Sequence, residues 1–294
     1  MTKIVRSFYP GSEWLYFKIY LGISTADDVL KNTIKPLMNG FLRKSWIDKW
    51  FFIRYSDPDY HLRLRLHVVD PTFIGDILVK VNKELAKYID TQLIHRICID
   101  TYEREIERYG ERQMIMSESV FYIDSVYTCD AIKVLSLLPK DYRWWYALYS
   151  IDHFLTVFKM DNLRKRDLMN KLSGAYKTEF GFNEHNSKSL NSLFRKNRKL
   201  IDNIVSKGEI DKSIHKIIHK RDSEFLKLSQ EPKFYSLDIP SCLHMMMNRL
   251  FEASNREIEM ILYFFLYHEY ESLICRNKLV GQASESQRRT RGAR

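Results

Sequence analysis

The segment YHLRLRLHVV, Tyr60–Val69, alternates between two kinds of side chain. Every second position is leucine or valine, and the positions between them are His61, Arg63, Arg65 and His67. Successive side chains of a β-strand point to opposite faces, so the pattern predicts a half-buried strand with one apolar face. The opposite face then carries a row of potential cations. Because like charges repel on one sheet face, this row needs an explanation.

Two interpretations of the cation row are open on the residues alone. Charged side chains on a strand face are commonly solvated, and they prevent association between sheet edges. Alternatively, two arginines on one strand face, roughly 7 Å apart by strand geometry, match the reach of two carboxylates. Each guanidinium can bind a carboxylate through two hydrogen bonds. Without further information, the solvated face is the more common case.

The sequence around this strand predicts a small, mostly antiparallel sheet. EWLYFKIYL (13–21) is typical of a strand, and KWFFIRYS (49–56) is another. The turn DPD (57–59) joins the second of these to YHLRLRLHVV, so we expect a hairpin there. QLIHRICIDTYERE (92–105) is rich in β-branched residues and is the fourth candidate.

Helical patterns separate these strands and then take over the chain. Residues 25–45 are predicted as a helix with Thr25 as N-cap, bent or divided at Pro36 because proline lacks an N–H. Residues 73–89 form an amphipathic helix pattern. From Gln113 onward the pattern is helical, and the last long helix is expected from Ser241 to Cys275.

The predicted fold class is therefore α+β, with a small sheet first and a mainly helical part packed on it. We expect a single domain over 1–280, which is strand-rich in 1–112 and helical in 113–280. The segment 281–294 holds four arginines, in QRRTRGAR, and is expected to be a basic, disordered tail.

Bulk properties exclude several classes of protein. The formal net charge of +10 favours anionic partners, but lysine and arginine are mixed with acids and no RNP-like or zinc-finger pattern occurs. We therefore expect no direct nucleic-acid binding. The four cysteines stand singly, which favours a reducing cytoplasm, and no segment is typical of a signal peptide or a membrane span. Dinucleotide, Walker, HExxH and GxSxG motifs are absent, and neither a metal nor an organic cofactor is implied.

A second group of candidate residues lies in DTYEREIERYG, residues 100–110. Arg104 and Arg108 are four residues apart, so they share a face in either a strand or a helix. Glutamates alternate with them, and a salt-bridged surface segment is the common reason for such a pattern. The segment gains functional weight only if it meets the cation row in space.

A third group lies in DIPSCLHMMMNRLF, residues 238–251. Asp238 is a plausible N-cap, and proline follows it in the first turn of the predicted helix. His244 and Asn248 are one turn apart, beside an apolar stripe. A histidine in this setting is more often structural; as a functional residue it would carry a proton, because its charge changes near neutral pH.

Four segments in this order resemble the C-terminal elimination domain of the class I lantibiotic dehydratases. They are WLYFKIYLG, KWFFIRYSDPDYHLRLRLHV, DTYEREIERYG with SESVFYIDS after it, and CLHMMMNRLF. The resemblance spans residues 13–270. The same domain occurs alone in thiopeptide-type bacteriocin biosynthesis proteins. Since this chain has no room for the glutamylation domain of full-length dehydratases, the free-standing form is expected.

The resemblance implies a lyase that removes glutamate from glutamylated Ser or Thr of a ribosomally made precursor peptide. The products are dehydroalanine and dehydrobutyrine. A base takes the Cα proton. Hydrogen-bond donors directed at the adjacent carbonyl must then stabilise the negative charge that builds on it. The implied partners are the glutamylated precursor peptide and a separate subunit that attaches glutamate from glutamyl-tRNA. Full-length dehydratases are commonly dimers, so a homodimer is allowed.

The resemblance also carries over residue by residue. The arginine pair of HLRLRL is Arg63 and Arg65, and the arginine of ERYG is Arg108. We expect these arginines to bind the glutamyl carboxylate and stabilise the enolate, and His244 to shuttle the proton, with the base unassigned. One departure is Glu111, which stands where the family usually has a second glycine behind Arg108. The remaining expected substrate-binding residues are Arg104, His61, Asn248 and Arg249.

Two other functions are compatible with the same segments. Thiopeptide pyridine synthases resemble this domain and join two dehydroalanines in a formal [4+2] cycloaddition, but they tend to lack the arginine and histidine set that is intact here. A non-catalytic peptide-binding subunit would keep the basic groove without needing His244.

Overall fold

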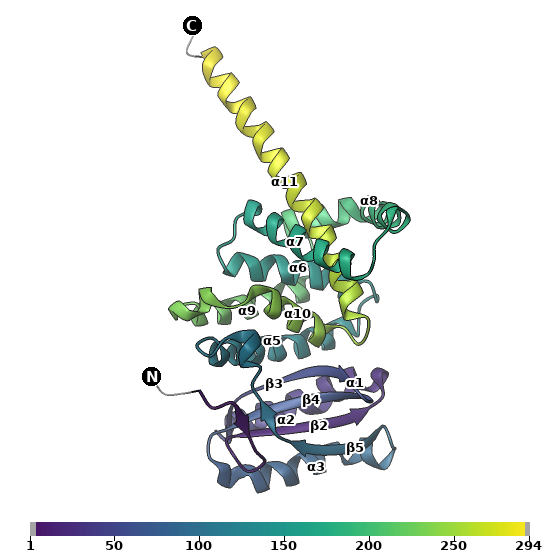
Figure 1. Ribbon diagram of the computed structural model, residues 1–294, viewed down its shortest axis with the longest axis vertical. Coiled ribbons are helices and arrows are strands. Elements are labelled where there is room, and N and C mark those ends of the chain that lie inside the picture. Colours follow the sequence, from purple (N-terminus) through teal and green to yellow (C-terminus); the bar gives the residue numbers. More distant parts are fainter. Residues whose placement is uncertain (1–3, 292–294) are drawn as a thin grey trace. The chain divides into compact units, whose positions relative to one another are not determined.

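The computed structural model describes residues 4–291, with side chains described as far as residue 278 (Figure 1). The chain folds into two compact units. The first comprises Met1–Lys140 and Lys216–Asn255, and the second comprises Asp141–His215 and Arg256–Arg294. The single domain over 1–280 stays a prediction. All candidate site residues belong to the first unit.

The first unit is built on a four-stranded antiparallel sheet in the order β3-β4-β2-β5. The short strand β1 pairs with β6 in a separate two-stranded sheet. The hairpin predicted around DPD is confirmed, because β3 and β4 pair along their whole length. The strands are β1 Ser7–Phe8, β2 Trp14–Leu21, β3 Ile47–Ser56, β4 Tyr60–Val68, β5 Ile94–Asp100 and β6 Tyr102–Glu103.

Helices of the first unit cover one face and one edge of this sheet (Figure 1). The first half of the unit contains α1 Ile23–Val29, a π-helical turn Leu30–Ile34, α2 Lys35–Arg43, a 3₁₀ turn Pro71–Phe73 and α3 Ile74–Asp90. The second half contains α4 Ile106–Tyr109, α5 Met114–Leu135, α9 Lys212–Leu228, a 3₁₀ turn Pro232–Ser236 and α10 Ile239–Leu250. The α+β class predicted from the sequence is confirmed.

The period-two pattern of β4 separates two faces of the sheet as predicted. Leu62, Leu64 and Leu66 are buried in the main core, against the apolar sides of α2 and α3. We call this side the core face, and we call the opposite side, which carries Arg63 and Arg65, the arginine face. Each fully buried leucine stabilises the fold by about 2 kcal/mol relative to exposure, so the register of β4 is strongly fixed.

The helix predicted for residues 25–45 forms, but its start differs from the expectation. The N-cap is Gly22, whose carbonyl accepts a hydrogen bond from the N–H of Thr25, so the prediction of Thr25 as N-cap is wrong. The helix is divided near Pro36, as expected. The π-helical turn interrupts the α-helical pattern just before this proline, and Pro36 lies in the first turn of α2. Proline is tolerated there because the first turn of a helix needs no N–H from it.

The last long helix predicted from Ser241 to Cys275 is two helices. After α10, Phe251 is extended and buried, and Ser254 has a φ of 52°, which ends the helix before α11, Asn255–Arg291. Helix α11 continues into the segment 281–294 for which disorder was expected. The side chains of that segment, and the whole of residues 292–294, lie outside the described residues.

The second unit consists of helices, and its core is aromatic. Buried aromatic residues on α6 and α11, among them Tyr146, Phe154 and Tyr263, fill its interior. Within the described residues, no helix is both long and apolar enough to cross a membrane. The helices are α6 Tyr142–Val157, α7 Asn162–Glu179, α8 Glu184–Lys207 and α11 Asn255–Arg291.

Candidate active site

The arginine face is defined by the register of the central strands. Arg65 lies between Phe51 of β3 and Tyr16 of β2, and Arg63 lies between Ile53 and Lys18. The row predicted from the sequence therefore forms, with aromatic neighbours on both sides of the second arginine. The first half of α5 contributes further apolar side chains to this face, and the second half packs with the main core.

The two histidines of the row relieve its charge. Arg63 Nε donates to His61 Nε2 at 3.1 Å, while His61 Nδ1 lies 2.8 Å from the carbonyl oxygen of Asp59. A ring that accepts at Nε2 and donates at Nδ1 is neutral, and burial lowers the pKa of His61, with the charge of Arg63 acting in the same direction. His67 pairs with Asp48 at 2.7 Å. Within the described part of the chain, Arg63 and Arg65 are therefore the two charged members of the row that form no ion pair with an acid.

Arg65 is buried among aromatic rings and is 8% exposed. Its guanidinium carbon lies 4.7 Å from the ring centres of both Tyr16 and Tyr102, and 5.4 Å from that of Phe51. Its Nε is buried without a hydrogen-bond partner, and no described carboxylate forms an ion pair with it. Cation–π contacts compensate part of the charge. A buried charge without a counter-ion is nevertheless expensive.

Arg63 is half-buried and stacks on Tyr55, with 3.4 Å between its guanidinium carbon and the ring centre. Asp100, on the neighbouring edge strand, forms an ion pair with Lys18 and not with Arg63, although the charge of Arg63 contributes to lowering the pKa of Asp100. Farther along this face, Arg96 stacks on Tyr20 at 3.8 Å. This part of the arginine face is consequently basic and partly open to solvent.

A narrow recess opens beside Arg65. Its rim includes two exposed acids, Glu103 and Glu105, and α10 contributes Met245. The recess joins the arginine face to the segments that carry the other candidates, because Tyr109 follows Arg108 and Met245 follows His244. The remaining lining residues are Phe51, Ile53, Tyr102, Met114 and Phe121.

Arg108 connects α4 to the start of α10. Its Nε donates to Ser241 Oγ at 3.0 Å, and its Nη1 lies 3.7 Å from Glu105 Oε2. The cap predicted for α10 is confirmed, since the Asp238 carboxylate accepts from the Ser241 N–H at 3.0 Å. His244 is three residues after Ser241, so it lies near the same face of the helix. The helix thus brings His244 toward the Arg108 side of the unit.

The departure at Glu111 leaves the turn behind Arg108 intact. Gly110 adopts a φ of 81°, a conformation that favours glycine, and its carbonyl accepts from the Met114 N–H at 3.0 Å. Glu111 itself is exposed and has no positive φ. One glycine therefore suffices for this turn.

Arg104 is placed differently from Arg63 and Arg65. Its Nε and Nη2 each donate to the Glu118 carboxylate at 2.7 Å, and its Nη1 donates to the carbonyl of Val5 at 3.0 Å. Glu118 is buried and also accepts from the Tyr102 hydroxyl at 2.9 Å. The guanidinium of Arg104 is thus satisfied by protein groups, and it fixes the ring on which Arg65 stacks.

Asn248 and Arg249 hold α10 against the edge of β3. The Asn248 amide accepts from the Arg54 N–H and donates to the Arg54 carbonyl, both at 2.9 Å, as a paired strand would. Arg249 Nε donates to the Phe52 carbonyl at 2.9 Å, and its Nη1 donates to Asp124 at 3.0 Å. These contacts satisfy an edge that would otherwise be open to pairing.

The structure therefore brings some candidates together and separates others. Arg63, Arg65 and His61 share the arginine face, and Arg108 contacts the start of α10, the helix that carries His244. Arg104, Asn248 and Arg249 contact protein groups instead. The sequence analysis missed the aromatic residues around Arg65, although the alternation in WLYFKIYL already places Tyr16 on the face opposite the apolar residues.

The family model for the lantibiotic biosynthesis dehydratase C-terminal domain matches residues 14–270. The chain belongs to this family. Among its relatives is the nisin biosynthesis protein NisB of Lactococcus lactis subsp. lactis, which is 24% identical over 274 residues. That match covers 91% of the chain and 26% of NisB. The epidermin biosynthesis protein EpiB of Staphylococcus epidermidis is 23% identical, over 88% of the chain and 26% of its own length. The chain thus spans about a quarter of these relatives.

Solved structures show the same fold for this member of the dehydratase C-terminal family. The crystal structure of the tRNA-dependent lantibiotic dehydratase MibB from Microbispora sp. 107891 matches with a TM-score of 0.69 at 17% identity. It covers 93% of the chain and 29% of MibB. The pyridine synthase TbtD from thiomuracin biosynthesis matches with a TM-score of 0.59 at 13% identity, over 89% of the chain and 98% of TbtD.

Proposed function

We propose that this member of the family eliminates glutamate from glutamylated Ser or Thr in a precursor peptide. The observation that carries the proposal is Arg65, a buried guanidinium without an acidic partner, next to Arg63, which also has none among the described residues. Such a pair needs an anion. The glutamyl ester brings carboxylate oxygens, and its elimination generates a further negative charge.

The proposed reaction uses these charges in sequence. A base removes the Cα proton of the esterified residue, and negative charge develops on the adjacent carbonyl oxygen. The electron pair then forms the Cα–Cβ double bond while the Cβ–O bond breaks, and glutamate leaves as a carboxylate. Arg65, in an apolar setting where electrostatic interactions are strong, stabilises the developing enolate, and Arg63 binds a carboxylate of the leaving glutamate. Arg108 supports the same anion from the α4 side.

The other candidate residues receive more specific roles. His244 moves the proton, since histidine is the side chain that most often serves as a general acid or base. His61 positions Arg63 through the 3.1 Å hydrogen bond, and Arg104 positions Tyr102 through Glu118. Asn248 and Arg249 position the helix that carries His244. In this proposal none of the last three contacts the peptide.

We propose further that a separate tRNA-dependent subunit attaches the glutamate, because the elimination needs a glutamylated peptide and the relative MibB is described as a tRNA-dependent lantibiotic dehydratase. The reaction is placed in the cytoplasm. The four cysteines form no disulfide, which is consistent with a reducing compartment. A homodimer stays an expectation.

The test is to incubate the purified chain with a synthetic peptide that carries one glutamyl-serine ester, and to follow its mass. We expect release of glutamate and a peptide lighter by one water than its unmodified form. Arg65→Lys and His244→Ala should leave the ester in place, whereas Arg96→Ala, on the same face, should react as the wild type does. An ester that persists in the wild type, with no release of glutamate, contradicts the proposal.

A second candidate is a cycloaddition, because the fold is also that of the pyridine synthase TbtD, which matches over 89% of the chain with a TM-score of 0.59. The same assay with a peptide that contains two dehydroalanines separates the candidates, because a cycloaddition produces a cyclised peptide and releases no glutamate. Peptide binding without either change identifies a non-catalytic subunit.

A further inference from the structure

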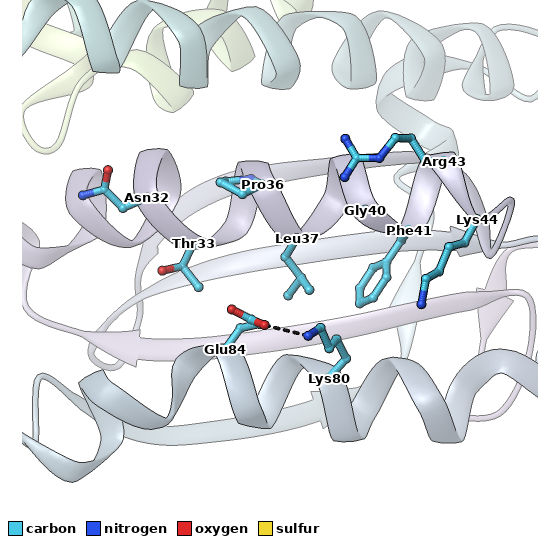
Figure 2. Close-up of a pocket in the computed structure, with 10 residues that line it drawn as sticks. All are labelled: Asn32, Thr33, Pro36, Leu37, Gly40, Phe41, Arg43, Lys44, Lys80 and Glu84. Carbon is cyan, nitrogen blue, oxygen red and sulfur yellow. Dashed lines mark ion pairs between the residues drawn. The ribbon is translucent and has the colours of Figure 1, made fainter.

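A groove lies between α2 and α3, on the core-face side of the sheet and away from Arg63 and Arg65 (Figure 2). Its volume is about 260 Å³. The floor is apolar, because Leu37 and Phe41 point from α2 into the gap between the two helices. Lys80 and Glu84 face it from α3 and pair with each other at 2.8 Å. The other lining residues are Asn32, Thr33, Pro36, Gly40, Arg43 and Lys44.

Gly40 leaves part of the wall of this groove without a side chain. Glycine inside a helix destabilises it by about 1 kcal/mol relative to alanine, and the common reason to keep it is close packing of another backbone. Here a Cβ built on Gly40 meets no described atom within 4 Å. The chain therefore keeps a bare helix surface over open space, next to the exposed ring of Pro36. A ligand that approaches the backbone of α2 would account for it.

The π-helical turn Leu30–Ile34 supports the same interpretation of the groove. Turns of this type are rare, and they occur frequently at functional sites. This turn places Asn32 and Thr33 at one end of the groove, as Figure 2 shows. Thr33 is almost fully buried and faces the gap between the helices.

Cations gather at the other end of the groove. Arg43 and Lys44 are exposed residues at the C-terminal end of α2 (Figure 2). Arg43 forms no ion pair with a described residue, and Lys44 lies 4.3 Å from the ring centre of Trp46 without an acid. With Lys80, the lining holds three cations and one acid, Glu84. A segment with apolar side chains for the floor and carboxylates for this end complements the groove.

We propose that this groove binds an acidic, amphipathic helix of a separate polypeptide. Its apolar side chains, spaced at i and i+3 or i+4, would lie on Leu37 and Phe41 beside Gly40, and its carboxylates would contact Arg43 and Lys44. A separate polypeptide complements the groove better than a second copy of this chain does, since the chain carries a net charge of +10. Its own C-terminal segment, QRRTRGAR, is basic as well. The site is independent of the proposed elimination.

The test uses a fluorescein-labelled synthetic helical peptide of about 18 residues, five turns, with one leucine face and one glutamate face. Fluorescence anisotropy measures its binding to the full chain. We expect saturable binding that weakens about tenfold or more in Gly40→Trp, which fills the groove, and in Arg43→Glu. Gly40→Ala adds a methyl group where the peptide would approach the backbone of α2, so it should weaken binding, by a smaller factor than Gly40→Trp. Lys233→Glu changes the net charge as Arg43→Glu does, at an exposed site outside the groove, and should bind like the wild type.

Several outcomes would overturn the proposal. One is equal binding of a scrambled peptide whose leucines no longer share a face, because binding would then reflect charge alone. Another is wild-type binding in both Gly40→Trp and Arg43→Glu. Dimerisation of the chain that is abolished by Gly40→Trp would assign the groove to a second copy. If Gly40→Trp fails to fold, the test rests on Arg43→Glu and Lys44→Glu, and wild-type binding in both would overturn the proposal. Glutamate elimination should be unchanged in every groove variant that folds, so failure of this proposal is distinguishable from failure of the proposed function.

Discussion

Two buried arginines of the first unit, Arg249 and Arg65, have opposite surroundings. Arg249 is fully buried and pairs with Asp124, and it donates to the backbone of β3 as well. Arg65 is nearly as buried, but its guanidinium packs against aromatic rings and forms no ion pair with a described residue. A paired buried charge holds elements together, whereas an unpaired one lowers stability and is retained where an anion binds. Burial of an arginine alone therefore does not identify a binding site; its partners do.

The largest effect is expected for Arg249→Met. This change leaves the Asp124 carboxylate buried without its main counter-ion, which destabilises proteins by about 3–5 kcal/mol. Urea unfolding monitored by circular dichroism measures the loss. The double variant Arg249→Met/Asp124→Leu should recover much of it, because no buried charge then remains. If Arg249→Met loses less than about 1 kcal/mol of unfolding free energy, the Arg249–Asp124 pair does not hold the fold together, contrary to the comparison.

Arg65→Met should show the opposite profile. Loss of a donor aimed at a developing negative charge lowers the rate by about 10²–10³-fold, while the free energy of unfolding should be unchanged or higher because an unpaired buried charge is removed. The assay is release of glutamate from the glutamylated peptide, together with urea unfolding. Arg96→Met is the matched control on the same face. If Arg65→Met is severely destabilised and keeps its activity, the arginine is structural.

Asn248→Ala extends the comparison of the two arginines to a side chain without charge. The side chain satisfies both the N–H and the carbonyl of Arg54, and unsatisfied buried groups cost about 1–3 kcal/mol. We expect a loss in this range, and a smaller loss of activity than in Arg65→Met. Hydrogen exchange of the Arg54 amide measures the local opening. Unchanged protection of that amide would show that α10 does not hold the edge through this residue.

The smallest effect concerns pH and the partner of Arg63. Burial lowers the pKa of His61. As the pH falls, His61 is therefore protonated in the unfolded chain at a higher pH than in the folded chain. Its contribution to stability is therefore present in full above about pH 6.5 and is lost as the pH falls through the lower, folded pKa. His61→Gln should show a shallower decrease of unfolding free energy on acidification than the wild type. Equal pH profiles would indicate that His61 is not the neutral partner of Arg63.

The sequence predicted the framework of this site well because alternation is a local property. The leucine row of β4 could face only a core, and the hairpin at DPD followed from its turn residues. The start of the first helix was missed because Gly22 caps it through its backbone carbonyl, without a side-chain hydrogen bond that the sequence could signal.

Partners distant in sequence also explain which arginines could not be assigned from the sequence. Arg104 and Arg65 look alike in the chain, and only the fold shows that Glu118 pairs with the first and no described acid pairs with the second. Likewise, Asp124 lies 125 residues before Arg249. Residue type and spacing identify a cation, but they do not show whether its counter-ion is already present.

The cover on β3 has a practical consequence for handling the protein. Because Asn248 and Arg249 occupy that edge, a neighbouring chain that tries to extend the sheet is confined to the opposite edge strand, β5. There Ile99 is 42% exposed, and no described side chain forms a hydrogen bond to the backbone of residues 94–99. Strand pairing between copies is thus expected at β5 and not at β3. The substitution Ile99→Lys places a charge on the β5 edge and should raise the concentration at which the protein stays in solution.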